Sequence, residues 1–184
     1  DECGRVATQK DGIVGSTAST FRYEGNSRIT TDRNGNQSIR VFNSNGLLVS
    51  HTDENGNIKT YTYDNRYNVI KETDANGNSV TMSYNSFNKP TVITDKNGNK
   101  TFVSYDAKGN TTSIRHPAID GVVSEETFVY NNRNQLTQYT DLRGTVTVYT
   151  YDSSAMPLTK KVGSKNAIHY SYQGGLLKSQ TDAM

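Results

Sequence analysis

A period of about 21 residues runs through the sequence, and this repetition limits the possible folds more than any other feature. An aromatic residue closes a strand-like run in each period. These aromatics, spaced by 19, 21, 21, 21, 25, 21 and 21 residues, are Tyr23, Phe42, Tyr63, Tyr84, Tyr105, Tyr130, Tyr151 and Tyr172. A fixed period of 20 to 50 residues is typical of repeat architectures, in which each unit packs on its neighbours. We therefore expect an array of similar units.

A column of aspartates lies ten residues before the aromatics, and most of its members open the phrase Asp-x-Asn-Gly-Asn. Asp120 falls in the same column without the phrase. The column is Asp32, Asp53, Asp74, Asp95 and Asp141, and the glycines of the phrase are Gly35, Gly56, Gly77 and Gly98. Asn-Gly tolerates the positive φ angles of tight hairpin turns, and an aspartate side chain can cap such a turn. The phrase therefore predicts a hairpin turn.

The residues after each Asp turn alternate between aromatic and small hydroxyl side chains, as in residues 60–63. Period-two alternation predicts a strand with aromatics on one face and hydroxyls on the other. A second turn and a weaker strand then follow, for example at residues 63–68 and 69–73, and Pro90 and Pro157 open two of the weaker strands. The 25-residue interval reflects an insertion near residues 116–119, where Pro117 indicates a loop.

Composition fits a thin sheet better than a compact core. Only 32% of residues are hydrophobic, tryptophan is absent and the mean hydropathy is −0.76. Twelve tyrosines and many threonines and valines nevertheless favour half-buried strands. We predict an all-β, antiparallel β-hairpin repeat array of some sixteen strands, with residues 1–184 as a single array of about eight repeats.

The charge pattern and the candidate sites argue against several classes of function. A net charge of +2 without clustering gives no footprint for nucleic acid, and no apolar stretch reaches membrane-spanning length. Cys3 is the only cysteine, so it can form no internal disulfide. His51, His116 and His169 match no zinc or triad pattern and are expected to be solvated surface residues. We predict no catalytic, cofactor or metal site, and hence no enzyme.

Two other interpretations of the repeated residues stay open. The phrase Asp-x-Asn-Gly-Asn offers hard oxygen ligands for calcium, but it lacks the frame of an EF-hand, so turn capping is the favoured interpretation. The tyrosines and asparagines could also form a carbohydrate-binding surface, although their periodicity favours packing within the sheet. Glycans are therefore possible partners.

The quoted residues resemble the YD repeats of bacterial Rhs proteins, wall-associated proteins, the C components of Tc toxins and animal teneurins. The family phrases are matched almost letter for letter by residues 105–110, Tyr-Asp-Ala-Lys-Gly-Asn, and residues 52–57, Thr-Asp-Glu-Asn-Gly-Asn. Two departures are Val162 in the aspartate column and Arg40 in place of an inward apolar residue. The resemblance covers essentially the whole chain.

The resemblance implies a β-sheet spiral that forms part of a hollow shell and encloses a C-terminal toxin or other cargo polypeptide. Its partners would be the remaining repeats of the parent protein and the cargo, and its location would be secreted, at the cell surface, or reached through a contact-dependent bacterial delivery system. Both ends cut through repeats, Asp11-Gly12 lying where a turn belongs, so we expect a fragment of a longer array. The alternative is a cell-surface adhesion or carbohydrate-binding module built on the same sheet.

Overall fold

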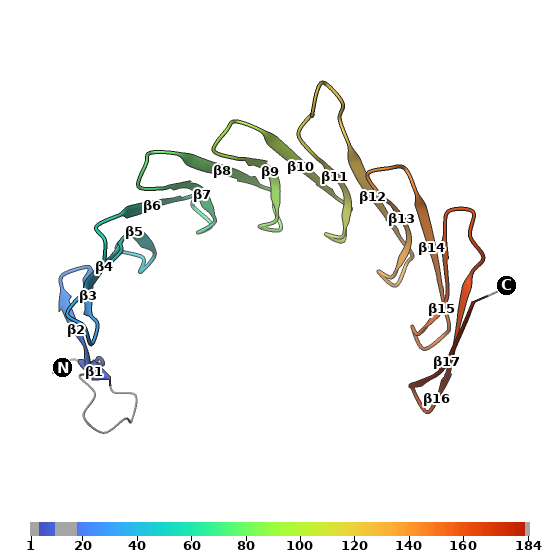
Figure 1. Ribbon diagram of the computed structural model, residues 1–184, viewed down its shortest axis with the longest axis horizontal. Helices are drawn as coiled ribbons and strands as arrows, with labels where there is room; N and C mark the ends of the chain where they lie inside the picture. Colours follow the sequence, from blue (N-terminus) through green and yellow to red (C-terminus); the bar gives the residue numbers. More distant parts are fainter. Residues whose placement is uncertain (1–3, 10–17, 183–184) are drawn as a thin grey trace. The chain divides into compact units, whose positions relative to one another are not determined.

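The computed structural model describes residues 4–9 and 18–182 and places seventeen β-strands and no helix within them (Figure 1). The described part thus contains no apolar helix of membrane-spanning length. Every described pairing joins strands that follow one another in the sequence, and each pairing is antiparallel. The predicted all-β hairpin array is therefore confirmed.

The first strand of each repeat has six residues and ends at the aromatic column or one residue beyond it. These strands are β2 (Ser19–Glu24), β4 (Gln37–Phe42), β6 (Ile58–Tyr63), β8 (Ser79–Tyr84), β10 (Lys100–Tyr105), β12 (Glu125–Tyr130), β14 (Val146–Tyr151) and β16 (Ile168–Gln173). The short strand β1 (Thr8–Gln9) precedes them and pairs with β2.

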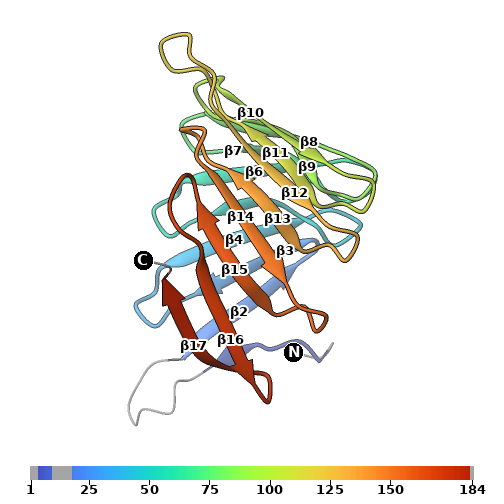
Figure 2. The ribbon, with the colours of Figure 1, turned by 90° about the vertical axis from the view of Figure 1, so that its right-hand side faces the viewer.

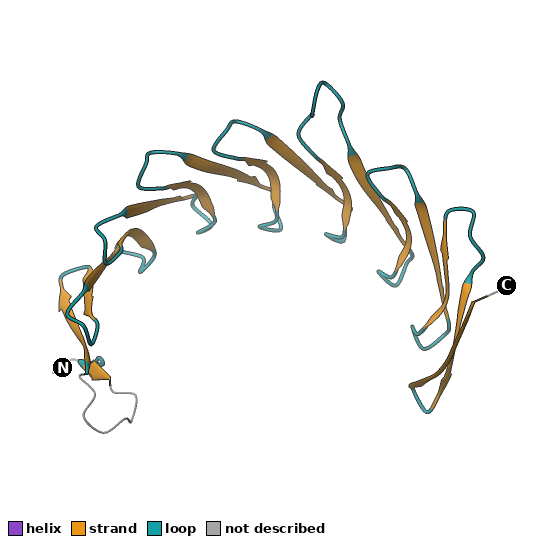
Figure 3. Ribbon diagram, viewed as in Figure 1, coloured by secondary structure: helices purple, strands orange, loops and turns teal. Residues whose placement is uncertain are grey.

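The second strands of the repeats alternate with the first, and most of them end at the next Asp turn. They are β3 (Ser27–Thr31), β5 (Leu48–Thr52), β7 (Val69–Thr73), β9 (Pro90–Thr94), β11 (Thr111–Arg115), β13 (Leu136–Thr140), β15 (Pro157–Val162) and β17 (Leu176–Asp182). Pro90 and Pro157 are the first residues of their strands, as predicted. Turns and loops connect the strands from β2 to β17 (Figure 3).

The described residues fall into two compact units. Unit 1 lies within Asp1–Tyr84 and Thr94–Gly98, and unit 2 within Asn85–Ile93 and Asn99–Met184. In unit 1, strands β1 to β8 pair in chain order. In unit 2, strands β10 to β17 do the same, and Figure 2 shows β14 to β17 side by side.

Neither unit has a hydrophobic core of the usual kind. Among the described residues, Ile29 is the one hydrophobic side chain in the buried class, at 7% exposure, and Ser38 and Thr147 are the buried polar ones. The aromatic side of the first strands is half-buried while the hydroxyl side is exposed, as in β6. Stability must therefore come from pairing and contacts between neighbouring strands.

A β-bulge follows the aromatic column in most repeats. In the hairpin of β6 and β7, Thr62 pairs with Lys71 but Tyr63 pairs with Val69, which leaves Ile70 without a partner. The same register shift occurs at Phe42, Tyr105, Tyr130, Tyr151 and Tyr172. Because a bulge breaks the alternation of a strand, the second strands show no simple pattern of exposure.

The insertion predicted near residues 116–119 forms a longer connection between β11 and β12 (Figure 3). Ile119 and Val122 form an isolated bridge around a tight turn at Asp120 and Gly121, which have φ angles of 51° and 78°. The assignment of Asp120 to the aspartate column was wrong, because its backbone makes the tight turn itself.

Candidate functional site

The aromatic column lies at the ends of the first strands, and its tyrosines bond to the strand before. Tyr63 Oη donates to the carbonyl oxygen of Leu48 at 2.7 Å, and Tyr84 Oη to that of Val69 at 2.8 Å. Equivalent bonds join Tyr105 to Pro90 at 2.8 Å and Tyr151 to Leu136 at 2.6 Å. In each pair the acceptor is fifteen residues earlier and opens a second strand.

These hydroxyl bonds occur where the backbone ladder is interrupted. Leu48 and Val69 each stand next to a bulged position, since the register skips one residue after them. A bulge leaves backbone groups without their ladder partners, and half-buried polar groups need other partners. The tyrosine hydroxyl supplies a donor at this point. The sequence spacing reveals the tyrosines but not this role, because the bulge has no local signal.

The 19-residue repeat departs from this arrangement. The hairpin of β2 and β3 pairs without a register shift, from Thr20 with Thr31 to Glu24 with Ser27. Phe42, which ends this repeat, has no hydroxyl to donate. The hairpin of β2 and β3 lacks a bulge, and the column residue that follows it is a phenylalanine and not a tyrosine.

The aspartate of each Asp turn closes its own turn. Asp53 Oδ1 accepts hydrogen bonds from the backbone N–H groups of Asn55 and Asn57 at 2.9 and 2.8 Å, and its Oδ2 accepts one from Asn57 Nδ2 at 2.8 Å. The N–H of Gly56 donates to the Asp53 carbonyl at 3.0 Å. The predicted capping is confirmed, but the positive φ belongs to Gly56 alone, at 82°. Asn55 contributes its backbone N–H and keeps an ordinary φ.

The second turn of most repeats has the same geometry, which the sequence pattern does not predict. Asp64 Oδ1 accepts from the N–H groups of Arg66 and Asn68 at 2.8 and 2.9 Å, and Tyr67 takes the positive φ, at 67°. The turns that begin with the same side-chain bonds to residues two and four positions later start at Asp32, Asn43, Asp53, Asp64, Asp74, Asn85, Asp106, Asn131, Asp141 and Asp152.

Val162 starts a turn of a different geometry. The Lys165 N–H donates to the Val162 carbonyl at 3.0 Å, as the Gly56 N–H does to Asp53, but the positive φ, 54°, belongs to Gly163 at the second position of the turn and not to the residue at the fourth. Asp95 keeps the short bond from the Asn97 N–H at 2.8 Å, and Gly98 has a φ of 85°.

The turn hydrogen bonds lower the pKa of the aspartates. In five turns the pKa of the aspartate is held below its ordinary value of 3.8, and the largest cause is the hydrogen bond from the amide side chain of the asparagine four residues later. These pairs are Asp32 with Asn36, Asp53 with Asn57, Asp64 with Asn68, Asp74 with Asn78, and Asp106 with Asn110. At Asp141 the pKa is lowered chiefly by the backbone N–H of Thr145. These carboxylates are therefore held in the charged form as hydrogen-bond acceptors.

Long side chains connect the second turns of successive repeats in unit 2. Lys89 Nζ donates to the Gly109 carbonyl, Lys108 Nζ to the Asn132 carbonyl at 2.8 Å, and Arg133 to the Ser153 carbonyl at 2.9 Å. Each bond spans 20 to 24 residues and joins one repeat to the next. The basic residues at these turns stabilise the stacking of the repeats.

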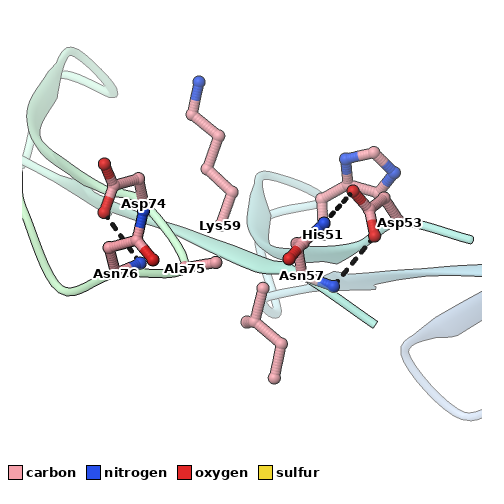
Figure 4. Close-up of a pocket in the computed structure, with 8 residues that line it drawn as sticks. His51, Asp53, Asn57, Lys59, Asp74, Ala75 and Asn76 are labelled. Carbon is pink, nitrogen blue, oxygen red and sulfur yellow. Dashed lines mark hydrogen bonds between the residues drawn. The ribbon is translucent and has the colours of Figure 1, made fainter. Parts of the chain in front are cut away.

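A shallow pocket of about 450 Å³ lies between two Asp turns of unit 1 (Figure 4). Figure 4 shows Asp53 and Asn57 bonded on one side and Asp74 and Asn76 on the other, with Lys59 between them. Asp53 already accepts three hydrogen bonds from its own turn. No group of three or more metal-binding side chains is found in the described ranges.

The histidines differ in their surroundings. His169 is exposed, as expected, but His51 is half-buried, and so is His116. Its Nε2 lies 3.2 Å from Glu126 Oε2, and Tyr139 donates to the other oxygen of Glu126. That bond raises the pKa of Tyr139 to about 12 and is the largest cause of the lowered pKa of Glu126. Cys3 and the Asp11-Gly12 position lie outside the described residues.

Comparisons with known proteins agree with the repeat pattern. The model of the Teneurin YD-shell family matches residues 18–181. A structure of the Tc holotoxin pore of Photorhabdus luminescens has a TM-score of 0.67 at 14% identity, covering 95% of this chain and 11% of that one. A crystal structure of TcdB2-TccC3-Cdc42 has a TM-score of 0.68 at 14% identity, covering 96% and 11%.

At this identity the two likenesses show the fold alone, and the chain spans about 11% of the length of the chains that it matches. A search of curated proteins finds no match.

Proposed function

This chain belongs to the Teneurin YD-shell family, and from this premise we propose that it is a non-catalytic wall segment of a shell that encloses a polypeptide, such as a C-terminal toxin domain. The aromatic and aspartate columns would define the repeats of that wall. The remaining repeats of the parent protein would be its partners, and a secreted or contact-delivered bacterial toxin would be its setting. The match of the family model to residues 18–181 carries the proposal.

The lack of a second layer supports a wall. Within the described residues, one hydrophobic side chain is buried, so the half-buried aromatic face of each unit is left to contact something else. A chain that folded around its own core would bury far more of its apolar surface. A wall segment instead presents one face to the enclosed space and the other to solvent.

Thiol labelling in the full-length parent protein tests this arrangement. We would replace Cys3 with serine and introduce one cysteine on each face, as Thr62→Cys on the exposed hydroxyl face and Val80→Cys on the aromatic face. In a closed shell, a bulky polymer maleimide reacts quickly at one position and slowly at the other. Labelling in denaturant controls for intrinsic reactivity. Equal native rates on both faces would contradict the proposal.

A further inference from the structure

A row of basic side chains crosses the aromatic face of unit 1. Register pairs join Arg28 to Arg40, Arg40 to His51, and His51 to Lys59, so four neighbouring strands each contribute one residue. Residues directly opposite in an antiparallel pair lie on the same face, with Cβ atoms about 4.5 to 5.5 Å apart. We call Arg28, Arg40, His51 and Lys59 the basic row.

The two arginines of the basic row are not neutralised within the described part of the chain. Lys59 Nζ forms an ion pair with Glu72 at 2.5 Å, but no ion pair is found for Arg28 or Arg40 among the described residues. Arg28 Nε is buried without a hydrogen-bond partner, and its guanidinium lies 6.0 Å from the centre of the Phe21 ring. Like charges directly opposite each other destabilise a sheet, and a buried donor without a partner is costly.

Arg40 occupies a position that packing alone would give to an apolar residue. It stands two residues before the aromatic column, next to Phe42 on the same face. The equivalent residues of the other repeats are Phe21, Tyr61, Met82, Val103, Phe128, Tyr149 and Tyr170. An arginine at this position, facing a second arginine, is a local conflict, and such conflicts are expected at functional sites.

We propose that the basic row binds an acidic, extended segment of the enclosed polypeptide, a proposal that rests on the function proposed above. Carboxylates would supply the counter-charges that Arg28 and Arg40 lack, and arginine holds carboxylates by paired hydrogen bonds. Strands lie about 4.8 Å apart, so the row spans roughly 14 Å. Alternate residues of an extended segment point to one side about 6.6 Å apart, so two or three carboxylates fit along it.

The opposite face of β3 to β6 carries no charged side chain. On the flanking strands, Arg22 and Glu24 of β2 are paired at 3.0 Å, and Lys71 of β7 is exposed. Lys71 pairs in register with Thr62, which belongs to the hydroxyl face. Lys71→Gln therefore removes one positive charge without touching the basic row and serves as a matched control.

Binding of labelled peptides to the 184-residue chain, followed by fluorescence anisotropy, tests the proposal. The probe is a peptide of alternating glutamate and serine, and the control peptide has glutamine in place of glutamate. We expect Arg40→Tyr, which restores the apolar repeat residue, to weaken binding of the glutamate peptide about tenfold. Lys71→Gln should leave it unchanged, and circular dichroism should show the same sheet content in both variants.

Three outcomes would overturn the proposal: equal binding of both peptides, unchanged affinity in Arg40→Tyr, or tighter binding of a single-stranded oligonucleotide than of the glutamate peptide. The last would assign the row to phosphates. Should Arg40→Tyr fail to fold, Arg40→Gln keeps a polar side chain there and is measured instead. Peptide binding does not depend on the result of thiol labelling. If the glutamate peptide binds to the basic row but both faces label equally, the row still binds acidic segments, and only the proposal that the segment belongs to an enclosed polypeptide is contradicted.

Discussion

At the scale of single residues, the hydroxyl of the aromatic column is the feature that distinguishes tyrosine from phenylalanine. The bond from Tyr63 to the Leu48 carbonyl joins two strands beside a bulge. We expect Tyr63→Phe to lower the free energy of unfolding by about 1 kcal/mol, because it removes one hydrogen bond and leaves the carbonyl without this donor. Urea denaturation followed by circular dichroism measures the change.

The matched control for this prediction is Phe42→Tyr. The hairpin of β2 and β3 has no bulge, so an added hydroxyl at Phe42 should change the unfolding free energy little. If Tyr63→Phe were neutral, or if Phe42→Tyr stabilised the chain as much as Tyr63→Phe destabilised it, the hydroxyl would not depend on the bulge.

The aspartate turns predict sensitivity to acid. The turn bonds lower the folded-state pKa of Asp53 and Asp74 below the ordinary 3.8, so folding favours their charged form. Their contribution to stability is present above the unfolded-state pKa and is lost as the pH falls through the folded-state pKa. Thermal unfolding measured from pH 7 down to about pH 2 should show stability decreasing below pH 4.

Asparagine provides the comparison for the acid prediction, since Asn43 and Asn85 start turns of the same geometry without a charge. The double variant Asp53→Asn and Asp74→Asn keeps an acceptor oxygen in each turn but does not titrate. Its stability should change less between pH 5 and pH 2 than that of the unchanged chain. An identical pH profile would show that other groups cause the acid sensitivity.

At the scale of elements, most repeats contain two similar five-residue turns separated by strands. The sequence predicted the first turn because the phrase Asp-x-Asn-Gly-Asn contains the residue types that such a turn requires, an aspartate that caps it and a glycine that adopts a positive φ. It did not predict that the second turn is the same, because Tyr67, Asn88, Asn134 and Ala155 replace the glycine there. The bulge was equally hidden, since it follows from pairing across strands and has no residue type of its own.

The natural residues other than glycine at the positive-φ position indicate where the turns can be stabilised. Ala155 has a φ of 70°, a left-handed conformation that alanine adopts at a cost. Ala155→Gly should raise the unfolding free energy by up to about 1 kcal/mol, because relief of strain outweighs the added freedom of the unfolded chain. Gly56→Ala, at a φ of 82°, should lower it by a similar amount. Denaturant unfolding of both variants measures these changes, and a loss of stability in Ala155→Gly would contradict the strain argument.

At the scale of the whole molecule, the repeat period and the low content of hydrophobic residues predicted a thin array. The small number of buried side chains among the described residues agrees with this prediction. The basic row was beyond prediction, although Arg40 stood out as a departure. Its members Arg28, Arg40, His51 and Lys59 follow one another at intervals of 12, 11 and 8 residues, and only the register of four strands brings them into one line. Register depends on turn and bulge lengths together, and one unforeseen bulge shifts every side chain after it.

The exposure of the last strand, β17, predicts that the 184-residue chain self-associates. All seven of its residues are exposed, with Leu176 at 75% and Leu177 at 57%, and its described pairing is with β16. An exposed strand with apolar side chains invites pairing with another chain, and lysine at such an edge opposes it. Light scattering after size-exclusion chromatography should show a mass that rises with concentration. Leu177→Lys should reduce this rise, whereas Leu142→Lys, at an exposed turn residue, should not. A monomer at all concentrations would mean that β17 is protected by other means.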